Sequence, residues 1–245
     1  MKIIAVADLH GNLPKDVPEC DLLVIAGDIC PHFGVWTKPG SPEDINGQIK
    51  WFSSIFLPWA GKQPAKSVVA TWGNHDFLGQ SEEIRDNDIA IAFTIPENFT
   101  LLLDAAVFAQ SQHIYGTPYT PCYFDWAFME TEDKLAERFA RIPEGLDILI
   151  SHGPPLWACD RAAGDKGDHI GSKVLYERIS TMQKPPKLLI CGHIHGGKGE
   201  GFVFGEHGAV HVWNVAGVDE AYSPHSPMWT EIKPIEKETT SGVSV

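Results

Sequence analysis

Hydrophobic positions in this chain fall into short runs of Val, Ile and Leu that alternate with amphipathic stretches. Such alternation is typical of a layered α/β domain whose strands are largely buried. The runs predict buried strands at residues 2–7, 22–26, 67–71, 147–150 and 187–191. Further strands, expected to form hairpins, are predicted at 100–103, 106–108, 112–116, 201–204, 209–215 and 228–232. We therefore expect pairing that is parallel early in the chain and antiparallel late.

Three helices are predicted between these strands. The first carries apolar residues with helical spacing at positions 45, 49, 52 and 56. The second covers residues 132–141 and has acidic residues in its first turn, where they complement the helix dipole. The third follows Ser172, a candidate N-cap, and has apolar residues at positions 175, 179 and 182.

The length of 245 residues is compatible with one domain, which we expect to cover residues 1–235 and to be followed by a flexible polar tail at 236–245. With 43% hydrophobic and 21% charged residues, the composition is that of a globular protein. No apolar run approaches the ~20 residues of a membrane span, so no membrane association is expected. The five cysteines form no C-x-x-C pair, which disfavours a disulfide framework and favours a cytoplasmic location.

Acidic residues outnumber basic ones, 32 to 19, which gives a formal net charge of −13. A field of this sign repels polyanions, and the sequence has no basic stripe to offset it. Binding of a nucleic-acid polymer is therefore disfavoured. A small substrate that bears phosphate would need a strong local positive charge.

Metal-ligand residue types follow five of the strand-like runs. The side chains concerned are Asp8, His10, Asp28, Asn74, His152, His193 and His195. In an open α/β sheet, ligands bind at the carboxyl ends of the strands, so these side chains are expected to converge in one crevice. Within D-x-H and H-x-H, extended backbone directs both side chains to the same side.

This set offers two carboxylates, four imidazoles and one carboxamide oxygen, and it contains no thiolate. Mixed nitrogen and oxygen ligands suit manganese, iron or zinc, and seven groups are too many for one tetrahedral zinc. Two ions that share one bridging aspartate would account for seven ligands. Asp28 is the expected bridge, because Gly27 beside it allows close approach of backbone and metal. Paired cations can clamp a phosphoryl group for in-line attack, and they would supply the local positive charge.

Taken in order, the motifs D-x-H, G-D, G-N-H-D, S-H-G-P-P and G-H-I-H resemble those of the calcineurin-like metallophosphoesterase superfamily, and they span residues 8–195. A closer similarity is to the branch of metallophosphoesterase-domain proteins of animals and bacteria. It rests on ADLHGNLP at 7–14, AGDICP at 26–31, SHGPP at 151–155, and YGTPYTP followed by FDWAF within 115–128. The resemblance implies a four-layer α/β/β/α sandwich with two mixed β-sheets and a metal site at the carboxyl ends of the strands.

The resemblance also implies residue roles. Asp8, His10 and His195 would hold the first metal ion. Asn74, His152 and His193 would hold the second, and Asp28 would bridge the two. His75 would be the catalytic histidine beside Asn74, with Asp76 orienting it. Both ions would be divalent, with Mn²⁺ expected first and Fe, Zn²⁺, Ni²⁺ or Co²⁺ as alternatives.

The activity expected from these roles is hydrolysis of cyclic nucleotides or similar small phosphodiesters by attack of a metal-bound hydroxide. The alternatives are a phosphomonoesterase, a hydrolase of nucleotide anhydrides, or a metal-stabilised regulatory binding protein. The partner would be a small phosphate ester, and the protein would be a monomer or a homodimer.

Two further features leave alternatives open. His169, in a glycine-rich stretch, could reach the mouth of the pocket, whereas the remaining histidines are interpreted as structural or surface residues. The aromatic segment 115–128 is interpreted as a long loop packed on the sandwich. Its alternative interpretation is a lid whose rings stack on a nucleobase.

Overall fold

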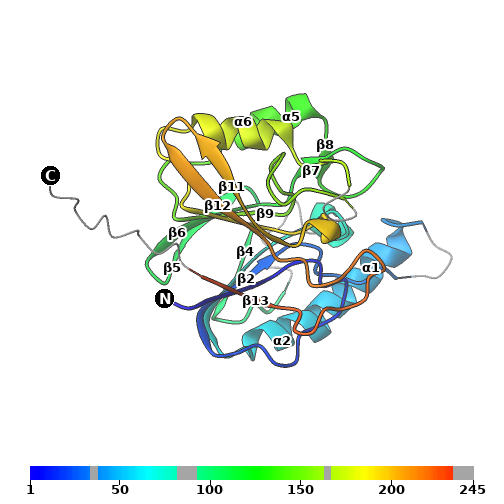
Figure 1. Ribbon diagram of the computed structural model, residues 1–245. Coiled ribbons are helices and arrows are strands. Elements are labelled where there is room, and N and C mark those ends of the chain that lie inside the picture. The colour runs from blue at the N-terminus through cyan, green and yellow to red at the C-terminus, as the bar shows by residue number, and fades with distance from the viewer. Residues whose placement is uncertain (34–37, 82–92, 163–166, 234–245) are drawn as a thin grey trace, which may run out of the picture.

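The structure is a computed structural model that describes residues 1–33, 38–81, 93–162 and 167–233 (Figure 1). Two large β-sheets form its centre. The five-stranded sheet has the order β13-β1-β2-β3-β4, with bounds β13 (Thr230–Ile232), β1 (Ile3–Val6), β2 (Cys20–Ala26), β3 (Ala65–Thr71) and β4 (Phe99–Leu102). The six-stranded sheet has the order β11-β12-β10-β9-β6-β5, with bounds β11 (Gly199–Gly205), β12 (Gly208–Asn214), β10 (Leu188–Cys191), β9 (Ile148–Ser151), β6 (Gln112–Thr117) and β5 (Ala105–Ala109).

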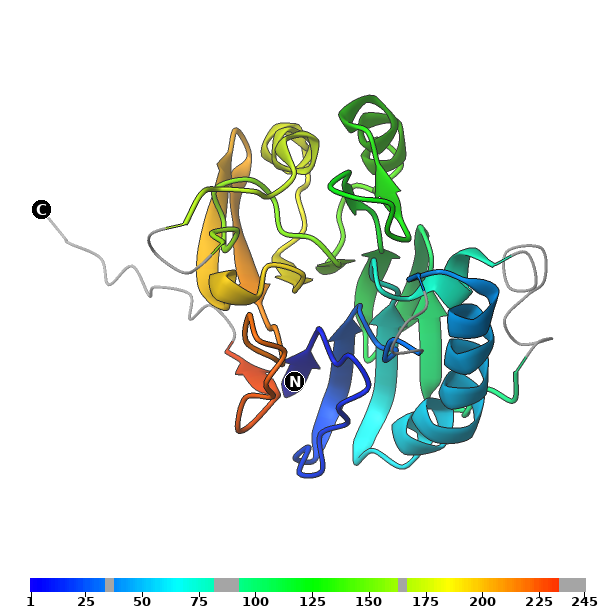
Figure 2. The ribbon, with the colours of Figure 1, turned by 90° about the vertical axis from the view of Figure 1, so that its right-hand side faces the viewer.

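Helices cover the outer face of each sheet, which confirms the expected four-layer sandwich (Figure 2). One side carries α1 (Pro42–Trp51), the π-helical segment η1 (Phe52–Phe56) and α2 (Leu57–Gly61). The other side carries α5 (Glu132–Phe139) and α6 (Lys173–Thr181), which contact each other. Every helix in the described part of the chain is too short or too polar to cross a bilayer.

Alternation along the strands builds two apolar layers. In β2, Leu22 and Val24 belong to the layer between the two sheets, where β2 contacts β9 and β10. Leu23 and Ile25 point to the other face and join the core beneath the helices, together with Phe52 of η1. Because successive side chains of a strand point to opposite faces, a strand covered on both sides reads as a continuous apolar run.

The predicted helices are present, with some changes of length. Ser172 caps α6 as expected, because its side chain accepts a hydrogen bond from the N–H of Leu175. The first predicted helix continues from α1 through η1 and α2 to Gly61. Its most buried α1 side chains are the polar Asp44 and Gln48, because both bind backbone groups of neighbouring loops. The tail at 236–245 lies outside the described residues.

The expected strand pairing is correct early in the chain and wrong in part later. β4 was expected in a hairpin, but it pairs in parallel with β3, and β5 belongs to the other sheet. Only Leu103 and Asp104 separate the two strands, so the chain passes between sheets there. β6 pairs in parallel with β9, and β12 pairs in parallel with β10. Antiparallel pairing joins β5 to β6, β11 to β12 and β1 to β13.

Candidate metal centre

The seven ligand-type side chains come together where five strands end. Asp8 and His10 follow β1, Asp28 follows β2, Asn74 follows β3, His152 follows β9, and His193 and His195 follow β10. Potential ligand atoms of six of them, together with those of His75, form overlapping groups of three in which all atoms lie within 4.8 Å of one another. These groups are Asp8, His10 and His195; His10, Asp28 and His75; and Asp28, His152 and His193. The structure therefore unites residues that are far apart in sequence in one buried cluster.

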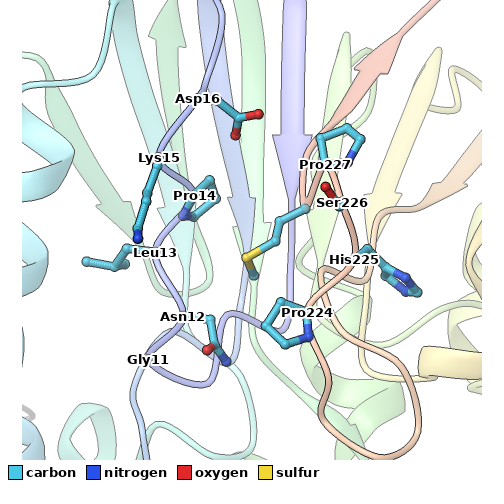
Figure 3. Close-up of a pocket in the computed structure, with 11 residues that line it drawn as sticks. Gly11, Asn12, Leu13, Pro14, Lys15, Asp16, Pro224, His225, Ser226 and Pro227 are labelled. Atoms are coloured by element: carbon cyan, nitrogen blue, oxygen red, sulfur yellow. The ribbon is translucent and has the colours of Figure 1, made fainter.

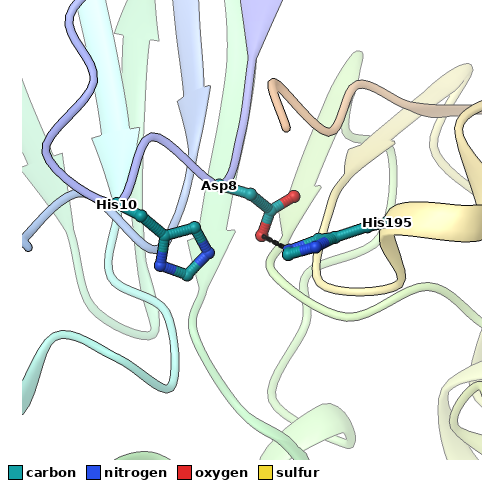
Figure 4. A group of neighbouring side chains, drawn as sticks. All are labelled: Asp8, His10 and His195. Carbon is teal, nitrogen blue, oxygen red and sulfur yellow. Dashed lines mark ion pairs between the residues drawn. The ribbon is translucent and has the colours of Figure 1, made fainter. Parts of the chain in front are cut away.

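The first group consists of Asp8, His10 and His195 (Figure 4). His195 Nε2 lies 3.8 Å from Asp8 Oδ1, and its Nδ1 is 3.0 Å from the carbonyl oxygen of Asp219. A carbonyl oxygen can only accept, so Nδ1 carries the proton and Nε2 keeps its lone pair toward Asp8. Such a partner orients a histidine as a metal ligand.

His10 carries the most direct sign of a missing partner. Its Nε2 is buried and has no hydrogen-bond partner among the described residues. Burial lowers the pKa of His10 to about 3, so its imidazole is neutral and can offer a lone pair. A buried polar atom without a partner is costly, and a metal ion would remove that cost.

The second group centres on His152, whose side chain is fully buried. Its Nδ1 is 2.8 Å from the carbonyl oxygen of Ala26, while its Nε2 is 2.9 Å from Asn74 Oδ1 and 3.3 Å from Asp28 Oδ1. Burial alone would lower the pKa of His152, but the charge and hydrogen bond of Asp28, the charge of Asp8 and the hydrogen bond to Ala26 together outweigh it and raise the pKa to about 9. His193 lies beside it, with ring centroids 5.0 Å apart, and burial lowers its pKa to about 3.

Asp28 stands between the two groups. Its Oδ2 lies 3.7 Å from His10 Nε2, and its Oδ1 lies 3.3 Å from His152 Nε2. The same Oδ1 accepts a hydrogen bond of 2.7 Å from the N–H of His75. One carboxylate oxygen thus faces each group, which is the arrangement that a bridging ligand requires.

The backbone at the cluster is held in an uncommon conformation. Asp8, His10, Asp28 and His193 have positive φ angles of 54°, 43°, 51° and 68°. Non-glycine residues rarely adopt this region of backbone conformation, because each residue held in a sparsely populated region costs about 1–3 kcal/mol. Four such residues in one cluster indicate that the surrounding structure fixes the direction of their side chains.

Two glycines make room for the carboxylates. A Cβ at Gly73 would collide with the backbone nitrogen and Oδ1 of Asp28, and a Cβ at Gly192 would collide with Asp8 Oδ2 and the Cβ of Ala7. The loops after β3 and β10 can approach Asp28 and Asp8 this closely only because these positions lack a side chain.

His75 lies beside the first group, and its ring centroid is 4.6 Å from that of His10 and 4.2 Å from that of Trp126. Burial lowers its pKa, which favours the neutral ring. Asp76 has a role that differs from the expected orientation of His75. Its carboxylate accepts hydrogen bonds from the N–H groups of Ile29, Cys30 and Gly73, and so ties the loop after β2 to the loop after β3.

Sequence reasoning missed three residues that shape the cluster. Gln48 of α1 donates to the carbonyl oxygen of His75 at 2.8 Å and accepts from the N–H of Leu78 at 3.0 Å. Asp219 contacts His195 as described above. Tyr222 lies near His10, with ring centroids 4.8 Å apart. No sequence pattern marks them, because a glutamine on a helix and polar residues in a late loop have no distinctive spacing.

His169 does not join the cluster. Its Nδ1 is 2.5 Å from Oδ1 of the buried Asp160, which also accepts hydrogen bonds from the N–H groups of Trp157 and Gly171. Trp157, Asp160 and His169 line a separate cavity of about 230 Å³. His169 therefore holds its own loop together.

Two cavities adjoin the cluster. One, of about 340 Å³, is lined by residues that include Asp28, Asn74, His75, His193 and His195, so it opens directly onto the ligand atoms. The other, of about 660 Å³, lies between the segment after His10 and the segment 224–228 (Figure 3). None of the seven ligand-type side chains lines this second cavity. The smaller cavity is thus the one in which a substrate would reach bound metal ions.

The donor set fits divalent metal ions. It consists of imidazole nitrogens, carboxylate oxygens and one amide oxygen, and this mixture suits manganese, iron or zinc. The unpartnered His10 Nε2 and the two-sided position of Asp28 agree with two ions rather than one.

Comparisons with known proteins agree with this geometry. A family model described as calcineurin-like phosphoesterase matches residues 1–197. Metallophosphoesterase domain-containing protein 1 of Homo sapiens is 30% identical over 219 residues, which are 81% of this chain and 61% of that protein. UPF0046 protein C25E10.12 of Caenorhabditis elegans is 28% identical over 206 residues, 80% of this chain and 69% of that protein.

A further similarity, again 30% identical over 206 residues, is to probable rhamnogalacturonate lyase C of Emericella nidulans. It covers 82% of this chain but only 18% of that protein. The chain therefore spans less than two thirds of the length of two of these three relatives. All seven ligand-type residues lie within the matched range 1–197, and the resemblance seen in the motifs is confirmed. The chain belongs to the calcineurin-like phosphoesterase family.

Proposed function

We propose that this protein is a metal-dependent phosphodiesterase that acts on small phosphodiesters such as cyclic nucleotides. The observation that carries the proposal is the convergence of Asp28 with six other ligand-type side chains, with His10 Nε2 buried and without a hydrogen-bond partner. When bound, two divalent cations would supply positive charge to phosphoryl oxygens and activate water as a nucleophile. Mn²⁺ is the ion that we propose first.

The protein residues around the ions would position the substrate and donate a hydrogen bond to it. The N–H of His75 is fixed on Asp28 and its carbonyl oxygen on Gln48, so the backbone of this loop cannot turn freely. The imidazole of His75 is therefore held beside the cluster. Because its pKa is lowered, the ring is neutral near pH 7 and holds one proton, which it can donate as a hydrogen bond to a phosphoryl or leaving oxygen.

Charge and size support a small substrate. The net charge of −13 repels extended polyanions, and the cavity over the cluster has a volume of about 340 Å³. A mononucleotide fits these conditions better than a nucleic-acid strand. Preference for a diester comes from the similarity to the metallophosphoesterase-domain branch, and hydrolysis of monoesters or nucleotide anhydrides is the second candidate.

The test compares bis(p-nitrophenyl) phosphate with p-nitrophenyl phosphate in the presence of Mn²⁺, followed by 2′,3′- and 3′,5′-cyclic nucleotides. We expect faster turnover of the diester. Faster turnover of the monoester would replace the proposed activity with the second candidate. If the protein bound manganese but turned over none of these compounds, a regulatory binding protein would be the better description.

His75→Ala separates catalysis from metal binding in the same assay. We expect this variant to keep its manganese and to lose about 10²- to 10⁴-fold in kcat, the usual contribution of a general acid or base. His113→Ala is the matched control, because His113 lies in β6 and stacks on Phe108. Unchanged activity of His75→Ala would refute the role given to His75.

A further inference from the structure

Aromatic side chains from two separate segments line the cavity over the metal centre. Tyr123, Phe124 and Trp126 lie between β7 (Thr120–Pro121) and β8 (Met129–Glu130), and Tyr222 lies between β12 and β13. Tyr123 is 74% exposed, Phe124 65% and Tyr222 49%. Large apolar side chains that gather in the exposed lining of one cavity are candidates for ligand contact.

Packing of the loop on the sandwich does not account for these residues. Within the aromatic segment 115–128, the rings of Tyr115, Tyr119 and Phe128 are buried in the core, as the simpler interpretation expects. Tyr123 and Phe124 instead point outward and contact each other, with ring centroids 4.4 Å apart. The segment thus divides into rings that pack the fold and rings that face the cavity.

Both aromatic segments are attached to residues of the metal cluster. The N–H of Ala127 donates to the carbonyl oxygen of Asn74 at 3.1 Å, which fixes the segment that carries Trp126. The carbonyl oxygen of Asp219 contacts His195 Nδ1 at 3.0 Å, which fixes the segment that carries Tyr222. The rings therefore have defined positions relative to the ligand atoms.

Tyr222 is held in place although its backbone conformation is unfavourable. Its φ angle is 61°, a region that non-glycine residues rarely adopt. The turn is held by Asp219, whose Oδ1 accepts hydrogen bonds from the N–H groups of Ala221 and Ser223. The ring is thereby placed near His10 and His195, with centroid distances of 4.8 and 5.3 Å.

We propose that Tyr123, Phe124, Trp126 and Tyr222 form an aromatic subsite that binds a planar ring carried by one ester group of the substrate. The inference rests on the proposed function and adds a determinant of specificity to it. Stacking on aromatic side chains is tolerant of ring identity, so the subsite selects aryl or nucleoside esters over alkyl esters. Tyr222 lies beyond residues 1–197, so the family match does not extend to it.

The first test measures binding without hydrolysis. Phenylphosphonate and methylphosphonate share the phosphonate group, and neither has an ester bond to cleave. Isothermal titration calorimetry on the manganese-loaded protein should show at least about fivefold tighter binding of phenylphosphonate, the lower end for one stacked ring. In the triple variant Tyr123→Ala/Phe124→Ala/Tyr222→Ala, this ratio should fall toward one while manganese content is unchanged.

The matched control is Phe108→Ala, which removes a ring that is 75% exposed on β5. It should leave the ratio at the wild-type value. Tyr222→Ala alone keeps the test valid if the triple variant fails to fold. An equal ratio in the wild type and these variants would overturn the subsite, and so would failure of both phosphonates to bind.

The second test uses two diesters with the same leaving group, bis(p-nitrophenyl) phosphate and methyl p-nitrophenyl phosphate. The wild type should prefer the aryl diester in kcat/KM, and the triple variant should lose at least about fivefold of that preference. Hydrolysis of both without preference would overturn the subsite and leave the proposed function standing. Ring-dependent phosphonate binding without any hydrolysis would support the subsite and refute the proposed phosphodiesterase activity.

Discussion

Among single residues, the protonation states and tautomers of the histidines define the candidate site. His195 and His152 each direct Nδ1 at a backbone carbonyl, so their Nε2 atoms face the carboxylates. His10 and His193 are neutral because burial lowers their pKa values to about 3. Neutral imidazoles with aimed lone pairs are ready to bind a metal. The sequence could supply the residue types but not these tautomers, because Asp219 and Ala26 act through backbone oxygens.

His10→Ala is the prediction that follows for the first metal group. The variant removes the buried, unpartnered Nε2 and should lower affinity for one of two manganese ions by more than about 100-fold. Loss of a group that only hydrogen-bonds to a metal ligand costs at most about that much. Titration calorimetry on metal-free protein measures the affinity. The control is His207→Ala, since His207 pairs with the exposed Glu206. Two unchanged sites in His10→Ala would exclude His10 as a ligand.

The cysteines give a second prediction at this scale. Burial raises the pKa of Cys159 to about 11 and those of Cys30 and Cys191 well above the ordinary value, whereas Cys122 is exposed. A raised pKa leaves the thiol protonated at pH 8, and only the thiolate reacts quickly. Iodoacetamide followed by peptide mass spectrometry should therefore label Cys122 first. Labelling of Cys191 at the same rate would contradict the burial of β10.

At the level of secondary structure, the positions of the buried strands were easier to predict from the sequence than the strands with which they pair. The apolar runs predicted β1, β2, β3, β9 and β10 because strands covered on both faces must be continuously apolar. Pairing direction was predicted correctly for the early strands but only in part for the later ones, and β4 illustrates the reason. Its sequence resembles a hairpin partner of β5, but the chain changes sheet at Leu103 and Asp104, a step that no local pattern announces. The amphipathic pattern of α1 likewise concealed the buried role of Gln48.

Gln48→Ala tests how α1 supports the catalytic loop. The substitution leaves the N–H of Leu78 without its partner and leaves the carbonyl oxygen of His75 with only the N–H of Phe77, so the free energy of unfolding should fall by about 1–3 kcal/mol. Activity should fall as well, because the His75 backbone loses its contact with α1. Urea denaturation and diester hydrolysis measure the two effects. Gln80→Ala, at an exposed position of η2 (Phe77–Gln80), is the control and should change neither.

At the level of the whole molecule, the candidate metal centre lies where the two sheets meet. Asp8, Asp28 and Asn74 come from the five-stranded sheet, whereas His152, His193 and His195 come from the six-stranded one. The convergence was predictable because parallel strands end at a common edge. The contribution of Tyr222 was not, since it depends on the loop between β12 and β13, whose path follows from the complete fold.

Because the candidate centre draws residues from both sheets, we expect the stability of the protein to depend on metal. Ions that bind the folded chain but not the unfolded chain stabilise it by about 2.7 kcal/mol at 100 times the dissociation constant. For a chain of this size, that corresponds to a rise in melting temperature of about 5–10 °C. Differential scanning calorimetry should show this rise when manganese is returned to protein stripped with EDTA. Equal melting temperatures with and without metal would argue against a centre that links the sheets.

Anomalous diffraction from crystals of the manganese-loaded protein would locate the bound ions. We predict two anomalous peaks within the cluster, one beside Asp8, His10 and His195, the other beside Asn74, His152 and His193, with Asp28 between them. Peaks located elsewhere, or a cluster that stays without anomalous signal at saturating manganese, would contradict it.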